Sequence, residues 1–122
     1  MKFFSLALLL VLRTAAVAPA QDAAVDHARQ IRDLLTQEKF DEATADFNDQ
    51  MKAALSAERL QQVWTTLKQQ FGAYKSEIDS RTARREGYTT ILLGCQFERA
   101  ALNMAIAFDA EGKVAGLSFS PR

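Results

Sequence analysis

Residues 60–79 read LQQVWTTLKQQFGAYKSEID, and the spacing of the apolar side chains changes within this stretch. Before Gly72 the apolar residues recur three or four positions apart, as on one face of a helix: Leu60, Val63, Trp64, Leu67 and Phe71. Ser56 is a good N-cap for this helix, and glycine is a common residue just after a helix end. From Tyr74 onward apolar and polar residues alternate, as in a strand. The stretch therefore predicts a helix that ends at Gly72 and a strand directly after it.

Two further helices are expected on the N-terminal side of this stretch. Within residues 26–37, helical spacing separates three apolar residues, Ala28, Ile31 and Leu35. Within residues 40–51, a single apolar stripe repeats every three or four positions and is formed by Phe40, Ala43, Phe47 and Met51. Each pattern is typical of an amphipathic helix with one buried face.

Only strand patterns follow on the C-terminal side. Residues 81–87 are polar and predict a turn, and three strand-like segments come after them: 88–97, 101–108 and 114–120. A parallel sheet would need crossover helices between these strands, and no segment there has a helical pattern. We therefore expect an α+β fold with about three N-terminal helices packed on one face of an antiparallel sheet of about four strands.

The first twenty residues have the pattern of a secretory signal peptide. An apolar run over residues 3–12 is followed by Ala18-Pro19-Ala20, a small-x-small cleavage site. The alternative is a retained membrane anchor, but a span needs about 20 apolar residues and Arg13 interrupts this run. We expect cleavage after residue 20, export to the periplasm or the medium, and a single domain over residues 21–122 without a membrane span.

Charge and composition exclude several classes of function. The whole chain has 15 basic and 15 acidic side chains; without Lys2 and Arg13 of the leader, 13 basic and 15 acidic remain, a net charge of −2. This balance argues against a nucleic-acid partner. His27 and Cys95 are the only residues of their types, so no histidine-based metal site and no intramolecular disulfide is expected. We expect no cofactor, a solvated His27 and a Cys95 packed in the core.

A candidate ligand pocket is suggested by the aromatic and soft side chains that would line the interior of such a fold: Phe40, Phe47, Trp64, Phe71, Tyr88, Met104 and Phe108. They would bind a small apolar ligand, with Tyr88 as a polar group, or they would simply fill the core. No catalytic residue is assigned, because acid–base chemistry needs a carboxylate in an apolar environment. The spacing of apolar and polar residues predicts no carboxylate in the core, and it places Glu77 and Asp79 on the outer face of their strand. Asp79 and Glu98 are the remaining candidates.

A hydrophobic and turn pattern recurs in five segments: Phe40–Ala43, Phe47–Asn48, Met51–Ser56, Leu60–Trp64 and Ala107–Leu117. The order of these segments resembles a family of secreted domains of unknown function, DUF 3887, and the resemblance covers roughly residues 25–121. It implies a curved, cone-shaped domain similar to nuclear-transport-factor-2-like and cystatin-like domains. Members often precede a secreted α/β-hydrolase domain, and the family has no established active-site residues. This chain has no Gly-x-Ser-x-Gly motif, so it is expected to be a stand-alone form or a separately encoded companion.

Two functions are compatible with the sequence. The first is an exported, non-catalytic module that binds a small ligand or a protein, as an accessory to a secreted hydrolase or another envelope protein. A face of small side chains on one strand (Ala101, Asn103, Ala105 and Ala107) adds the expectation of a homodimer through the sheet face. The second is a small lyase- or isomerase-like enzyme that uses a pocket carboxylate or Tyr88.

Overall fold

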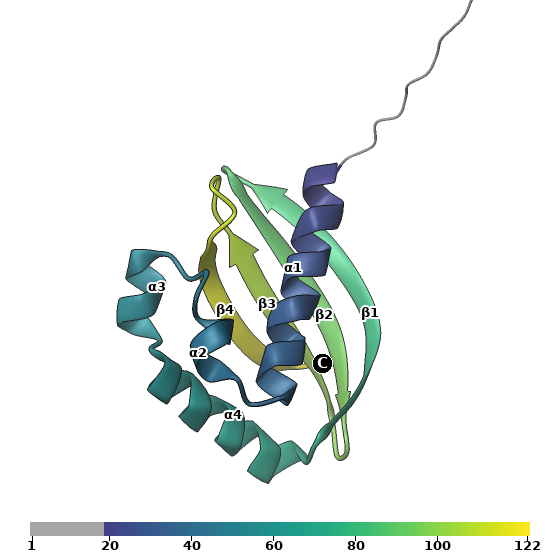
Figure 1. The fold of residues 1–122 in the computed structure, drawn as a ribbon. Coiled ribbons are helices and arrows are strands. Elements are labelled where there is room, and N and C mark those ends of the chain that lie inside the picture. Colours follow the sequence, from purple (N-terminus) through teal and green to yellow (C-terminus); the bar gives the residue numbers. More distant parts are fainter. Residues whose placement is uncertain (1–18) are drawn as a thin grey trace, which may run out of the picture.

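Within residues 19–122, the part of the chain that the computed structural model describes, four helices precede four strands (Figure 1). The helices are α1 (Pro19–Thr36), α2 (Phe40–Ala43), α3 (Asp49–Ala54) and α4 (Ala57–Phe71). The strands are β1 (Tyr74–Arg85), β2 (Tyr88–Phe97), β3 (Ala101–Phe108) and β4 (Val114–Pro121). The predicted α+β class is confirmed, with four helices instead of about three. The predicted signal peptide lies outside the described residues except for Pro19 and Ala20, which begin α1.

The apolar stripe over residues 40–51 forms two short helices, so the prediction of one helix was wrong. The side-chain oxygen of Asn48 accepts a hydrogen bond from the Met51 N–H at 2.9 Å, which caps a new helix at this point. Phe47 lies between α2 and α3 and forms an isolated parallel bridge with Val114 at the start of β4. The residues of the stripe are nevertheless buried, because both short helices face the same core.

The four strands form an antiparallel sheet in the order β1-β2-β3-β4, so each strand pairs with the next one along the chain. The predicted turn over residues 81–87 was wrong in extent, because β1 continues to Arg85. Only Glu86 and Gly87 turn the chain, and both have positive φ angles, 53° and 84°. This conformation suits a two-residue hairpin turn. The polar residues before it belong to an exposed edge strand.

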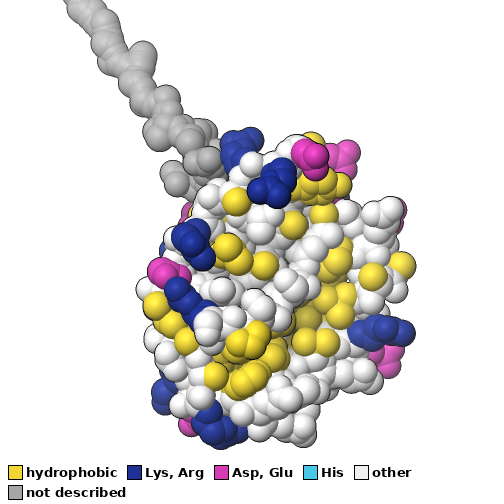
Figure 2. Space-filling view, turned by 180° about the vertical axis from the view of Figure 1, so that it is seen from behind, with side chains coloured by type: hydrophobic (Ala, Val, Ile, Leu, Met, Phe, Trp, Pro, Cys, Tyr) yellow, Lys and Arg dark blue, Asp and Glu magenta, His cyan; other side chains and the backbone are white. Residues whose placement is uncertain are grey.

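The helices lie on one face of the curved sheet, and the core fills the space between them (Figure 1). Alternate residues of β3 point into this core: Leu102, Met104, Ile106 and Phe108. Figure 2 shows the face that the helices leave uncovered, where small apolar side chains are mixed with polar ones. An ion pair between Arg122 and Asp79 lies across this face at 3.0 Å, above Gly94. No helix within residues 19–122 is long and apolar enough to cross a bilayer.

The side chain of Glu77 connects the sheet to α1, which corrects its predicted position on the outer face. Its Oε2 accepts a hydrogen bond from Arg29 Nη2 at 2.9 Å, and its Oε1 accepts one from Arg32 Nη1. Register shifts in β1 between Tyr74 and Ser76 and again after Glu77 change the alternation of the strand. The hydrogen bond from Arg29 and the neighbouring Arg32 hold the pKa of the Glu77 carboxyl below its ordinary value of 4.5.

This lowered pKa predicts an acid-sensitive contribution to stability. A carboxylate whose pKa is lower in the folded state stabilises the fold above its unfolded pKa, and this contribution is lost as the pH falls through the folded pKa. We expect Glu77→Gln to lower the free energy of unfolding by about 1.5 kcal/mol at pH 7, because the substitution removes the charge-assisted hydrogen bonds that the carboxylate accepts. Below about pH 4.5, the ordinary value, the difference between variant and wild type should shrink steadily. Urea unfolding of the variant and the wild type, from pH 7 to below about pH 4.5, measures this difference in stability. Glu111→Gln, in an exposed turn, is the control. A difference that does not change with pH would contradict the assignment.

Candidate ligand-binding groove

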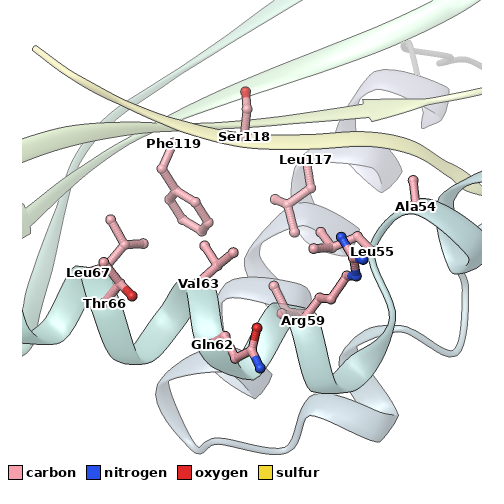
Figure 3. Close-up of a pocket in the computed structure, with 11 residues that line it drawn as sticks. Ala54, Leu55, Arg59, Gln62, Val63, Thr66, Leu67, Leu117, Ser118 and Phe119 are labelled. Carbon is pink, nitrogen blue, oxygen red and sulfur yellow. The ribbon is translucent and has the colours of Figure 1, made fainter.

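A groove separates the edge strand β4 from helix α4 and encloses a volume of about 500 Å³. We call it the α4–β4 groove; it is lined by Ala54, Leu55, Arg59, Leu60, Gln62, Val63, Thr66, Leu67, Leu117, Ser118 and Phe119. Leu117 and Phe119 point from β4 toward α4, and Val63 and Leu67 point from α4 toward β4 (Figure 3). Ser118 points to the opposite side of the strand (Figure 3). The walls of the groove are therefore mainly aliphatic and aromatic.

The groove exists because α4 uses only part of its apolar stripe for the core. Leu60 and Trp64 are buried, with 0% and 2% exposure, and they fix the helix against the interior. The Trp64 ring lies 5.9 Å from the Phe97 ring and 6.2 Å from the Phe119 ring, measured between centroids. Val63 remains 38% exposed. Two side chains of the stripe thus hold the helix, while others line an open groove.

Arg59 is the charged residue of the lining, and its guanidinium lies beside Leu55 at the groove (Figure 3). Its backbone N–H donates to the N-cap oxygen of Ser56 at 3.3 Å, which fixes Arg59 in the first turn of α4. Among the described residues, the ion pairs join other side chains and none includes Arg59. The groove therefore offers apolar walls together with one unpaired cation, a combination suited to an amphiphilic anion.

The lining contains no carboxylate, imidazole or thiol that could move a proton. The two carboxylates considered from the sequence have structural partners elsewhere. Glu98 Oε1 accepts a hydrogen bond from the Ala73 N–H at 2.9 Å, and Asp79 pairs with Arg122. Over residues 19–122 no group of three His, Cys, Asp or Glu side chains is placed to hold a metal ion. The groove is thus equipped for binding, and its own side chains provide no acid–base pair.

The seven residues predicted to line a pocket lie elsewhere in the structure. Five of them are buried together in the core: Phe40, Phe47, Trp64, Met104 and Phe108. Phe71 is half-buried at the end of α4, and Tyr88 is 49% exposed at the start of β2. None of the seven lines the α4–β4 groove. Their role in ligand binding stays a prediction.

Sequence reasoning missed the groove residues, although part of the signal was present. Leu117 and Phe119 alternate with polar or small residues in the last strand, and both face the helix side of the sheet. Val63 belongs to the apolar stripe of α4, and nothing in the spacing shows that it remains exposed. The groove forms because α4 lies at a distance from β4. The local spacing of apolar residues carries no information about this distance.

His27 is more enclosed than its sequence context suggested. Its Nε2 lies 3.0 Å from Asp46 Oδ2, and its ring stacks on Phe108 with centroids 4.8 Å apart. A cavity of about 410 Å³ adjoins it and is also lined by Arg84 and Asp109. Asp109 accepts hydrogen bonds from the backbone of its own hairpin. These contacts connect α1 to the loop before α3, which gives His27 a structural role.

The family comparison agrees with the sequence resemblance. The profile of the family described as "Protein of unknown function (DUF3887)" matches residues 28–117, and the chain belongs to this family.

A curated relative is Esterase EstD of Thermotoga maritima (strain ATCC 43589 / DSM 3109 / JCM 10099 / NBRC 100826 / MSB8), which is 32% identical to this chain over 85 residues. The match covers 70% of this chain and 21% of that esterase, so the chain corresponds to about a fifth of its relative. No solved structure gives a significant match.

Proposed function

We propose that this chain is a non-catalytic binding module that holds the acyl chain of a carboxylate or ester in the α4–β4 groove. The observation that carries the proposal is the lining itself, with Leu55, Val63, Leu67 and Phe119 as apolar walls and Arg59 as the unpaired cation. Each buried methylene of a ligand contributes about 0.8 kcal/mol, so an alkyl chain gains affinity from these walls. A terminal carboxylate gains further from the guanidinium.

The proposed ligand class fits an accessory role beside an exported hydrolase. The relative named above is an esterase, and ester hydrolysis consumes an acyl ester and releases a carboxylate. A module that retains such a molecule would raise its local concentration near the catalytic domain without performing chemistry. The signal-peptide pattern of residues 1–20 supports a site of action outside the cytoplasm.

Titration with decanoate, followed by tryptophan fluorescence, tests the proposal. Trp64 is the only tryptophan of the chain and its ring is 6.2 Å from that of Phe119, so filling the groove should change its emission in a saturable way. We expect Arg59→Gln to weaken decanoate binding about fivefold, because an exposed ion pair contributes up to about 1 kcal/mol. The same variant should bind uncharged decanol as well as wild type does.

A matched pair of variants identifies the groove as the site. Val63→Asp places a charge in the groove and should weaken decanoate binding at least about tenfold. Ile78→Asp makes the same kind of change at an exposed aliphatic residue on β1, outside the groove, and should leave binding unchanged. Equal affinity in the two variants, or no saturable signal in the wild type, would overturn the proposal.

A further inference from the structure

The two edges of the sheet differ sharply in their protection against pairing with another strand. The edge strand β1 has two register shifts and six charged side chains, Lys75, Glu77, Asp79, Arg81, Arg84 and Arg85. The opposite edge strand, β4, has the sequence VAGLSFSP without a charged residue, and its one register shift lies at its start. Charges and bulges are the usual means by which proteins prevent edge-to-edge pairing. β4 lacks them over most of its length.

The backbone contacts show which part of β4 is open. At its start, Val114 is covered: its N–H donates to the Asp46 carbonyl and its carbonyl accepts from the Asn48 N–H, both at 2.9 Å. Past its end, the Arg122 N–H donates to the Ala101 carbonyl of β3 at 3.2 Å. Because backbone groups alternate in direction along a strand, Leu117 and Phe119 direct their N–H and C=O groups away from β3.

We propose that β4 of a second copy of this chain adds antiparallel to this open edge, around a two-fold axis at Ser118. In this register Leu117 lies opposite the partner's Phe119, and Phe119 opposite the partner's Leu117. These are the residues with outward-directed backbone groups, so each facing pair exchanges hydrogen bonds across the interface. The two four-stranded sheets become one continuous sheet.

Charge is what favours a second copy as the occupant. A two-fold contact places a strand against itself, so it requires a strand that does not repel its own copy. The uncharged strand β4 meets this condition. Pairing of β4 with the β1 edge of another copy would instead bring the uncharged strand against six charges and two register shifts. That head-to-tail arrangement is disfavoured, and assembly stops at two copies.

The second copy would also complete the α4–β4 groove, a part of the inference that rests on the proposed function. Leu117 and Phe119 point toward α4 (Figure 3). On a continuous sheet the partner's Leu117 and the partner's Phe119 point to the same side, since side chains on one face of neighbouring strands are aligned. They would lie beside the open edge of the groove and form its missing wall.

Charge substitution at the proposed axis tests the pairing. Ser118 is exposed and would face the partner's Ser118 directly, so Ser118→Lys or Ser118→Asp puts two like charges next to each other. Light scattering after size exclusion should give a dimer mass for the wild type, and each charged variant should dissociate at least about tenfold more readily. A mixture of the two charged variants should recover the dimer. Ser76→Lys, an exposed change on β1, should keep it.

Each outcome decides a separate part of the inference. A monomeric wild type, or charged variants that dimerise like the wild type, would overturn the pairing, and so would a mixture that stays monomeric. If the dimer forms as described but decanoate does not bind, the proposed function fails and the pairing stands. If monomeric Ser118→Lys and monomeric Ser118→Asp both bind uncharged decanol as tightly as the wild-type dimer does, the partner does not complete the groove.

Discussion

Replacement of Phe47 by alanine is expected to lower the free energy of unfolding by about 3–5 kcal/mol, the range for large aromatic side chains removed from a core. Phe47 is 1% exposed and lies between α2 and α3. Its bridge to Val114 attaches the segment between these helices to the start of β4. Loss of the ring leaves a cavity where the segment between the two short helices contacts the start of β4.

Urea unfolding monitored by circular dichroism measures this loss. Phe71→Ala is the matched control, because it removes the same ring from a half-buried position at the end of α4, and it should cost about half as much or less. Phe47→Leu keeps most of the volume and should retain a folded protein. An equal loss for Phe47→Ala and Phe71→Ala would contradict a central role for Phe47.

The buried thiol of Cys95 gives an independent measurement. Burial raises its pKa to about 11, so at neutral pH it is an unreactive thiol that becomes accessible when the protein opens. Labelling of Cys95 should be faster in Phe47→Ala than in the wild type, by about tenfold for each 1.4 kcal/mol of stability lost.

Replacement of Gly72 by alanine should lower the free energy of unfolding by about 2–4 kcal/mol, from strained backbone and a steric clash together. Gly72 ends α4 with φ 84° and ψ −167°, a region that other residues almost never occupy. A Cβ at this position would come within 2.6 Å of Glu98 Cβ and Oε1. Glu98 is held there because its Oε1 accepts the Ala73 N–H. Its side chain therefore moves aside only by losing that hydrogen bond.

Gly87→Ala separates the two contributions to this loss. Gly87 has the same φ of 84°, but no atom lies within 4 Å of a Cβ placed there. We expect a loss of about 1 kcal/mol for Gly87→Ala, from the backbone conformation alone. Thermal and urea unfolding of the two variants provide the comparison. If Gly72→Ala and Gly87→Ala lower the free energy of unfolding equally, the contact with Glu98 does not destabilise Gly72→Ala.

Much of the fold could be predicted because its signals are local. Ser56 and Gly72 bound α4 as expected, with the Ser56 side chain accepting the Arg59 N–H and Gly72 adopting a positive φ. In β3 the predicted face of small side chains is also present, and the large side chains on the opposite face are buried in the core. Errors arose where a contact distant in sequence decides the conformation. Phe47 interrupts a helical stripe because it pairs with Val114, and Glu77 turns inward because β1 shifts its register.

The candidate site was less predictable for the same reason. The seven aromatic and soft residues were compatible with a pocket or with a filled core, and five of them pack together in the interior. The groove instead forms where α4 and β4 diverge, and it is lined by ordinary residues such as Val63 and Leu117. Their side-chain types carry no special signal, since the same residues fill cores in most proteins. Only the arrangement of the elements distinguishes a groove wall from a core position.

The sequential order of the strands in the sheet also determines how the chain folds. Each strand pairs with its neighbour in sequence, so the sheet assembles through short loop closures that cost little chain entropy. Contacts distant in sequence, such as Phe47 with Val114, must close a far longer loop. The hairpins of the sheet should consequently form early in folding, and the segment between α2 and α3 should dock late. A stability loss at Phe47 should then appear mainly as faster unfolding, with the refolding rate nearly unchanged.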